Sequence, residues 1–136
     1  MSNLQEDLFG HAIPKAKKTE THIGIKKAKQ IAIGKTITLC GPTIYKYEYA
    51  RVNMLLTLAG NLVISCGVFR DDFKDIEEYR FLLESIHRHK ISISDMIFVI
   101  NVNNFVGKHT REEIAYAESI NKEVVYLFDE KGNKVL

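Results

Sequence analysis

The sequence predicts an α/β fold of the flavodoxin-like or Rossmann-like kind, with a parallel sheet of four to five strands and helices on both faces. Short apolar segments alternate with segments whose apolar residues recur every three or four positions. The segment "MIFVINV", residues 96–102, is apolar throughout, which is typical of a central parallel strand that is buried on both faces. Strands that alternate with helices form βαβ units, and such units build a parallel sheet with covering helices.

The alternating region begins at residue 36. The segment "TITLC", residues 36–40, is expected to be a short buried strand, and the "GPT" after it is a turn signal. A helix is expected from about residue 47 to residue 59, because Gly60 stops the helical pattern. The apolar segment "NLVISCGVF", residues 61–69, is expected to form the second strand.

The second part of the alternating region follows an acidic loop. Apolar residues at helical spacing predict the next helix, namely Ile76, Tyr79, Leu83 and Ile86. Residues 96–102 then form the third strand. A helix is expected at residues 110–121 and a fourth strand at residues 124–128. A turn at residues 129–133 then leads to a short last strand at residues 134–136.

Residues 1–34 are expected to be a basic N-terminal tail or linker in front of one α/β domain at residues 35–136. Residues 10–34 contain few large apolar side chains and show no steady helical or strand period. Residues 1–36 carry seven lysines against three acidic residues, whereas residues 37–136 carry twelve Lys and Arg against fourteen acidic residues. The basic lysines are not interleaved with aromatic or arginine residues, which favours a solvated tail over a nucleic-acid-binding segment.

The tail contains one short docking motif. In "LQEDLF", residues Gln5, Asp7, Leu8 and Phe9 resemble the QxDLF pentapeptide through which bacterial replication proteins bind the sliding clamp. Two exposed apolar residues after an acidic pair can dock in a hydrophobic groove. The alternative is that Leu8 and Phe9 pack on this protein's own body or on a second subunit.

The composition excludes several classes of protein. The chain has 136 residues, 46% of them hydrophobic and 26% charged, which suits one globular domain. No apolar run approaches the roughly 20 residues of a membrane span. The two cysteines, Cys40 and Cys66, give no disulfide framework, and the N-terminus does not resemble a secretory signal. We therefore expect a protein of the reducing cytoplasm that is not embedded in a membrane.

A ligand site is expected beyond the carboxyl ends of the strands, where open parallel sheets bind ligands. Three loops meet there, with the sequences "CGPTIYK", "CGVFRDD" and "NVNNFVGKHT". Glycines allow the backbone to approach a ligand closely, and amide and hydroxyl groups can contact a sugar, a base or a phosphate. The residues expected to bind substrate are Cys40, Gly41, Pro42, Thr43, Tyr45, Gly67, Phe69, Asn101, Asn103, Asn104 and Thr110.

Two glutamates stand at the start of the expected last helix. If Thr110 is the N-cap, Glu113 is the N3 residue of a TxxE capping box, and this reading requires no chemistry. Helical geometry places Glu113 near the buried face and Glu112 toward water. A carboxylate at a helix N-terminus is favoured in its ionised form, and an ionised, partly shielded carboxylate can act as a nucleophile.

The segment "TREEIAYAESINKEVVYL" resembles the nucleoside 2-deoxyribosyltransferase family, whose third crossover reads in outline GTxxELGYAxxxGKxV. The residues that match this outline are Thr110, Glu113, Tyr116, Ala117 and Val124. The segments "TLCGPTIYK" and "IHRHKISISDMIFVINV" resemble the family's nucleotide-binding first loop and the stretch that leads into its third strand. The likeness spans about residues 36–128 and is greatest for short, uncharacterised bacterial and phage members.

The resemblance implies that Glu113 is the nucleophile in cleavage or transfer at an N-glycosidic bond. A carboxylate beneath the anomeric carbon can attack as the bond to the base breaks, and it then holds the sugar until water or another base accepts it. A nucleoside or nucleotide is the implied ligand, without a cofactor and without a metal. The family also implies a homo-oligomer in which a neighbouring subunit closes the pocket.

The sequence departs from the family pattern at several positions. His87 and Gly107 stand where the family commonly has aspartates near the base. His87 is therefore a candidate proton donor to the leaving base, since imidazole exchanges protons near neutral pH, and the alternative is a packed or surface histidine. Pro42 and Ile44 replace the Ser and Arg that often contact a phosphate, which makes a 5′-phosphorylated substrate less certain.

Other polar residues have simpler interpretations. Cys40 and Cys66 end neighbouring strands but lack the spacing of a metal site, so two buried free thiols are expected. Asp95 is expected to be a turn residue at the amino end of the central strand. Asp72 either solvates its loop or reaches a ribose hydroxyl.

Three functions are compatible with these observations. The first is an enzyme that cleaves or transfers N-glycosidic bonds through Glu113. The second is a catalytically inactive protein that binds a nucleotide-like ligand and is tethered to a replication clamp by its tail. The third is a structural or protein-binding module.

Overall fold

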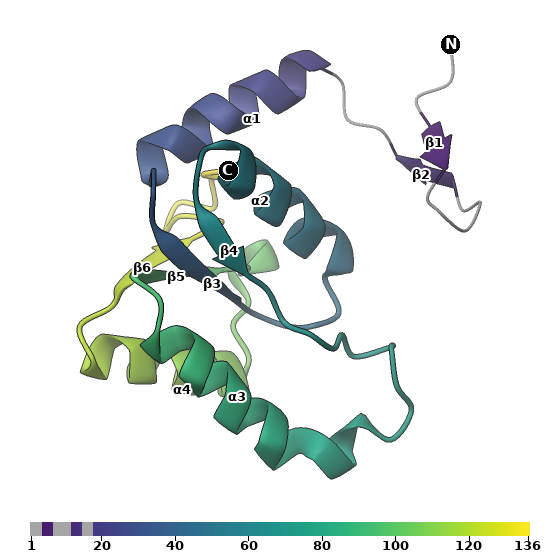
Figure 1. The fold of residues 1–136 in the computed structure, drawn as a ribbon, viewed down its shortest axis with the longest axis vertical. Helices are drawn as coiled ribbons and strands as arrows, with labels where there is room; N and C mark the ends of the chain where they lie inside the picture. The colour runs from purple at the N-terminus through teal and green to yellow at the C-terminus, as the bar shows by residue number, and fades with distance from the viewer. Residues whose placement is uncertain (1–3, 7–11, 15–17) are drawn as a thin grey trace.

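The centre of the molecule is a four-stranded sheet whose strands are all parallel, in the order β4-β3-β5-β6 (Figure 1). The structure is a computed structural model that describes residues 4–6, 12–14 and 18–136. The strands are β3 (Thr36–Cys40), β4 (Leu62–Ile64), β5 (Met96–Val99) and β6 (Glu123–Tyr126). The predicted α/β fold with a parallel sheet is confirmed.

The two faces of the sheet are covered by different pairs of helices (Figure 1). One face packs against α1 (Lys18–Ile31) and α2 (Lys46–Leu58). The other packs against α3 (Arg80–Ser92) and α4 (Lys108–Ser119). A short 3₁₀ helix, η1 (Ile76–Tyr79), precedes α3, and a second one, η2 (Val102–Asn104), follows β5. None of the helices in the described ranges is long and apolar enough to cross a membrane.

A second, two-stranded antiparallel sheet lies near the N-terminus. It pairs β1 (Leu4–Glu6) with β2 (Ala12–Pro14). Gln5 of the predicted docking motif is in β1, whereas Asp7, Leu8 and Phe9 lie outside the described residues. The predicted clamp contact therefore stays a prediction.

Side chains alternate along β3, and this alternation decides the chemistry of each face. Ile37 and Leu39 are fully buried among the residues of α1 and α2. Cys40 is equally buried but packs with Ile91 of α3 and Ile114 of α4. Because successive side chains of a strand point to opposite faces, the segment "TITLC" gives an apolar surface to one face and polar atoms to the other.

The helix α1 occupies part of the segment that the sequence predicted to be a tail or linker. Its buried residues are small, Gly24 and Ala28, and Ala32 directly after the helix continues the same spacing, so the usual pattern of large apolar residues is absent. A Cβ atom at Gly24 would come within 2.8 Å of the Leu55 side chain of α2. The small residues therefore let the two helices pack closely.

Several element boundaries also differ from the predictions. Residues 65–69, expected in the second strand, form a loop after β4, and residues 134–136 form only an isolated antiparallel bridge between Phe128 and Lys134. The helix α4 begins at Lys108, with Gly107 as its N-cap and no side-chain cap. The predicted capping box of Thr110 and Glu113 is therefore wrong, since Thr110 lies inside the helix and is buried.

Candidate functional site

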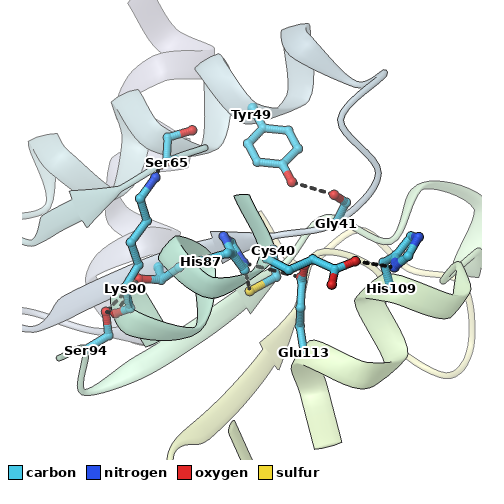
Figure 2. A network of polar contacts seen from close by, with 11 residues as sticks. Cys40, Gly41, Tyr49, Ser65, His87, Lys90, Ser94, His109 and Glu113 are labelled. Atoms are coloured by element: carbon cyan, nitrogen blue, oxygen red, sulfur yellow. Dashed lines mark hydrogen bonds and ion pairs between the residues drawn. The ribbon is translucent and has the colours of Figure 1, made fainter. Parts of the chain in front are cut away.

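Three side chains from three separate elements meet at the carboxyl edge of the sheet (Figure 2). They are Cys40 at the end of β3, His87 in α3 and Glu113 in α4. The His87 Nε2 atom lies 3.2 Å from the Cys40 Sγ atom and 3.3 Å from the Glu113 Oε2 atom. All three residues are candidates from the sequence, but the sequence does not predict that they contact one another.

The turn after β3 fixes the position of Cys40. Gly41 has a φ of +143°, and a Cβ atom there would lie 2.7 Å from the Ile100 carbonyl oxygen, so only glycine fits without movement. The Ile100 amide donates a hydrogen bond of 2.7 Å to the Cys40 carbonyl. On the other side, the Tyr49 hydroxyl of α2 donates one of 2.7 Å to the Gly41 carbonyl (Figure 2). Cys40 is thus held between β5 and α2.

Hydrogen bonds to the sheet fix the position of His87 on α3 (Figure 2). The Lys90 carbonyl, one turn after His87, accepts bonds from the Thr38 hydroxyl at 3.1 Å and the Ser94 hydroxyl at 2.8 Å. The Lys90 ammonium group donates to the Ser65 carbonyl at 3.0 Å. Thr38 lies two residues before Cys40 and points to the same face, so one strand anchors the helix and supplies the thiol.

Glu113 projects from α4 toward the sheet, and Glu112 beside it is exposed, as the sequence predicted. The side chain of Glu113 is 24% exposed and that of His87 is 14% exposed. Among the described residues, the Oε2 atom of Glu113 is buried and accepts no well-directed hydrogen bond, despite its closeness to His87. A buried oxygen in this state is costly unless something that is not part of the chain satisfies it.

The thiol of Cys40 is a poor nucleophile in this setting. Burial raises its pKa well above the ordinary value, and the nearby negative charge of Glu113 raises the pKa further. Both effects oppose formation of the thiolate, which is the reactive form. Among these three groups, the carboxylate of Glu113 is therefore the better candidate for direct attack on a substrate.

A small hollow between α3 and α4 opens beside Glu113, and its volume of about 20 Å³ is room for about one water molecule. Its walls are polar and charged, and they are formed by Glu84, Arg88, His109, Glu112 and Glu113. His109 and Glu84 form an ion pair of 3.2 Å across the two helices, and the Arg88 guanidinium lies over the Tyr116 ring at 5.2 Å. Among the described residues, the Oε2 atom of Glu113 makes no hydrogen bond to its own helix, and the hollow before the carboxylate has room for about one water molecule.

Glu84, Arg88 and His109 were not predicted from the sequence as site residues. Their helical spacing could have identified them, because Glu84, His87 and Arg88 lie within one turn of α3. In the same way, His109 lies one turn before Glu113 in α4. Each of the three is a charged or titratable residue on a partly exposed helix face, which is the ordinary pattern of a solvated helix. The pattern became informative only when the fold placed α3 beside α4.

The first two predicted binding loops contact each other. The Arg70 amide donates to the Thr43 carbonyl at 3.3 Å, and the Lys46 ammonium pairs with Asp72 at 2.5 Å. Phe69 packs edge-on against Tyr49, with ring centres 5.3 Å apart. The predicted residues Pro42 and Thr43 are half-exposed here, Gly67 is exposed, and Tyr45 packs against the core of the α1 and α2 face.

Asp72 and Asp95 both hold backbone groups. The Asp72 carboxylate accepts a hydrogen bond of 2.8 Å from the Phe69 amide in addition to its pairing with Lys46. Asp95 accepts one of 2.8 Å from the Thr36 amide, at the amino end of the sheet. The prediction that Asp95 is a turn residue is therefore confirmed.

The third predicted binding loop has a structural part and an exposed part. The Asn101 amide group donates to the Phe128 carbonyl at 2.9 Å and accepts from the Phe128 amide at 2.8 Å, so it ties the end of β5 to the segment after β6. Asn103 and Asn104 are exposed and adopt left-handed backbone angles, with φ of 56° and 58°. The exposed part of this loop is therefore at Asn103 and Asn104, although the Asn104 side-chain oxygen accepts a hydrogen bond of 3.3 Å from the Asn101 amide group.

No protein-family model, curated protein or solved structure matches this chain. The likeness to nucleoside 2-deoxyribosyltransferases therefore rests on the residues already quoted.

Proposed function

We propose that the protein cleaves or transfers the N-glycosidic bond of a deoxynucleoside, a nucleotide or a related metabolite, with Glu113 as the nucleophile. The observation that carries this proposal is the Glu113 carboxylate, which is partly shielded and borders a small hollow of about 20 Å³ at the carboxyl edge of a parallel sheet. Among the described residues, its buried Oε2 atom has no hydrogen bond of good geometry. Ligands bind at that edge in open α/β sheets.

The chemistry requires two steps. A Glu113 oxygen forms a bond to the anomeric carbon while the bond from that carbon to the base nitrogen breaks, and the electron pair leaves with the base, which takes up a proton. Water or a second base then attacks the same carbon and releases Glu113. Partial shielding from water favours the first step, because it lowers the solvation of the attacking carboxylate.

We assign His87 to the control of this carboxylate. Its Nε2 atom lies 3.3 Å from Glu113 Oε2, so the imidazole can hold the carboxylate in position. The same nitrogen can donate a proton to the leaving base only if the base binds within hydrogen-bond reach of it. His87→Gln separates the two roles, since loss of a proton donor alters the shape of the pH–rate profile, whereas loss of positioning lowers the rate evenly.

The direct test is to incubate the protein with a panel of deoxynucleosides and nucleotides and to follow free base by chromatography. Glu113→Gln keeps the size of the side chain and should lower base release by about 10³-fold or more, as expected for loss of a nucleophile. Glu118→Gln, an exposed glutamate on the same helix, is the matched control, and Glu112→Gln should cost far less than Glu113→Gln. Equal losses at residues 112 and 113 would contradict the assignment.

The same panel distinguishes the alternative of an inactive binding protein. Isothermal titration with each nucleoside and nucleotide measures binding without turnover. Binding that depends on the pocket residues but releases no base would support the alternative. The Pro42 and Ile44 positions, which lack the hydroxyl and guanidinium expected at a phosphate site, make nucleosides the first ligands to test.

We also propose that two copies of the chain associate through the outer side of α3. Phe81 is 77% exposed, and Leu82 and Ile86 are also exposed, which is a large apolar surface for the helix that borders the pocket. A second copy covering this side would also shield the pocket from water. Light scattering should show a dimer or a larger ring, and Phe81→Glu should reduce its mass, whereas Leu58→Glu on the exposed side of α2 should not.

A tether to a sliding clamp through Gln5, Asp7, Leu8 and Phe9 is a further part of the proposal. It is supported by the motif alone. A peptide of residues 1–12 should bind a bacterial sliding clamp in a fluorescence polarisation assay. A peptide with Leu8→Ala and Phe9→Ala should not bind, and equal binding by both peptides would disprove the motif.

A further inference from the structure

The donor atoms of Cys40, His87 and Glu113 all lie within 4.8 Å of one another (Figure 2). A thiolate sulfur, an imidazole nitrogen and a carboxylate oxygen are the three kinds of donor that Zn²⁺ takes from proteins. We propose that these three side chains form a binding site for a divalent transition metal ion of the Zn²⁺ type.

The spacing of the donor atoms suits a tetrahedral ion. Bonds of about 2.3 Å to sulfur and about 2.0–2.2 Å to nitrogen and oxygen place neighbouring donor atoms roughly 3.4–3.6 Å apart. The observed separations are 3.2 Å between His87 Nε2 and Cys40 Sγ, and 3.3 Å between His87 Nε2 and Glu113 Oε2. The third pair, the Cys40 sulfur and a Glu113 carboxylate oxygen, lies within 4.8 Å, so small side-chain rotations are needed to bring all three donors to one ion.

The unbonded Glu113 oxygen independently indicates a missing ligand. Among the described residues, Oε2 is buried and has no hydrogen bond of good geometry, although the Cys40 thiol can donate to this carboxylate. A single Nε2 atom faces both the sulfur and this oxygen, and it can donate at most one proton. A metal ion resolves this conflict, because it accepts an electron pair from all three donors at once.

The charge of the site also fits a divalent cation. When the metal binds, the Cys40 thiol releases its proton to solvent, and the resulting thiolate and the Glu113 carboxylate together balance a charge of 2+. Cys40 is closed to solvent, whereas Glu113 is 24% exposed and borders the pocket between α3 and α4. The ion therefore enters past Glu113, and three protein ligands leave one position of a tetrahedral ion open.

Metal binding can be measured directly, without an assay of the glycosidic activity. The two are linked through Glu113, since an oxygen bound to a metal is not free to attack a sugar. If the proposed function holds, a loaded site should therefore suppress base release, and this regulatory consequence alone rests on that function.

The test uses the full chain without a polyhistidine tag, stripped of metal by a chelator and titrated with Co²⁺. The expected result is a thiolate-to-cobalt charge-transfer band in the near ultraviolet, together with visible bands of a tetrahedral site, and Zn²⁺ should displace the Co²⁺. Cys40→Ser should abolish the charge-transfer band. His87→Gln and Glu113→Gln should weaken binding at least about a hundredfold, the upper end of what loss of an outer-shell partner costs.

Matched variants control for adventitious binding. Cys66→Ser removes the other free thiol, and His109→Gln and Glu112→Gln remove nearby groups outside the cluster; all three should keep the band. Circular dichroism checks the fold of each variant. If Cys40→Ser fails to fold, Glu113→Gln still tests the site, because the Glu113 side chain is partly exposed and its replacement should disturb the fold less. A wild-type protein without the band, or equal losses in Cys40→Ser and Cys66→Ser, would overturn the site. A band without base release would retain the metal site and reject the proposed enzyme.

Discussion

The two faces of the central sheet bury different kinds of side chain. In the described residues, the α1 and α2 face has a core of fourteen buried residues, including Leu39, Leu56 and Phe98. The α3 and α4 face has a core of six, and it also holds the buried hydroxyls of Thr38 and Ser94 and the cluster of Cys40, His87 and Glu113. One face therefore supplies most of the stabilising apolar burial, and the other holds the polar groups that can do chemistry.

The unequal contribution of the two faces to stability is tested most strongly at two adjacent residues of β3, whose side chains point to opposite faces of the sheet. Leu39→Ala should lower the free energy of unfolding by about 3 kcal/mol, because it removes buried methyl groups and leaves a cavity in the larger core. Cys40→Ala should cost only about 1 kcal/mol, since the side chain is smaller. Urea unfolding of both variants measures the difference, and similar losses would mean that both faces contribute equally to stability.

The division between the faces also explains how much the sequence predicted. The strands from β3 to β6 and the helices α2 to α4 were found, because their apolar patterns are strong. The helix α1 was missed, because Gly24 and Ala28 make its buried stripe from small residues that the usual hydrophobic pattern does not record. The end of β4 was placed too late, because the apolar residues Val68 and Phe69 continue the strand pattern into a loop.

The candidate site was predicted in its parts but not as an arrangement. Glu113 was expected to face inward and Glu112 outward, and the structure places them so. The contact of His87 with Cys40 joins residues 47 positions apart, and it depends on how α3 docks on β3. Such docking is set by the hydrogen bonds of Thr38, Lys90 and Ser94, which have no sequence pattern of their own.

The turn that joins the two faces at Cys40 provides the next prediction. Gly41→Ala should lower the free energy of unfolding by about 2 kcal/mol, because a φ of +143° strains any other residue and the added Cβ meets the Ile100 carbonyl. Gly67→Ala is the control, since a Cβ there meets no atom within 4 Å. Thermal unfolding of the two variants should therefore differ, and an unchanged Gly41→Ala protein would show that the turn can relax.

Removal of the hydrogen bond from the Thr38 hydroxyl to the Lys90 carbonyl, which anchors α3 to β3, should have a smaller effect on stability. Thr38→Val keeps the shape of the side chain but removes the hydroxyl that donates to Lys90, which should cost about 1 kcal/mol. Thr57→Val removes an exposed hydroxyl on α2 and should cost less. Urea unfolding measures both costs. If this hydrogen bond positions His87, Thr38→Val should also weaken Co²⁺ binding, whereas Thr57→Val should leave Co²⁺ binding unchanged.

The smallest effect is expected at the exposed ion pair between Lys46 and Asp72, at the start of α2. The Lys46 ammonium holds the pKa of Asp72 below its ordinary value, and the bond from the Phe69 amide lowers the pKa further. Because the folded-state pKa is lowered, the contribution of Asp72 to stability is present at neutral pH and is lost as the pH falls through the acidic range. Lys46→Gln should raise the pKa of Asp72 toward its ordinary value, as followed by carbon NMR of the carboxyl group.

Salt provides the control for this last prediction. The pair is exposed, so added salt should screen it and raise the pKa of Asp72 in the wild type, while the Lys46→Gln protein should respond much less. Cobalt binding should be the same in both proteins, because the pair belongs to the loops on the α2 side of β3 and not to the cluster under α3 and α4. A change in cobalt binding would show that the two faces communicate through the turn at Gly41, and the separation between an apolar and a chemical face would then be incomplete.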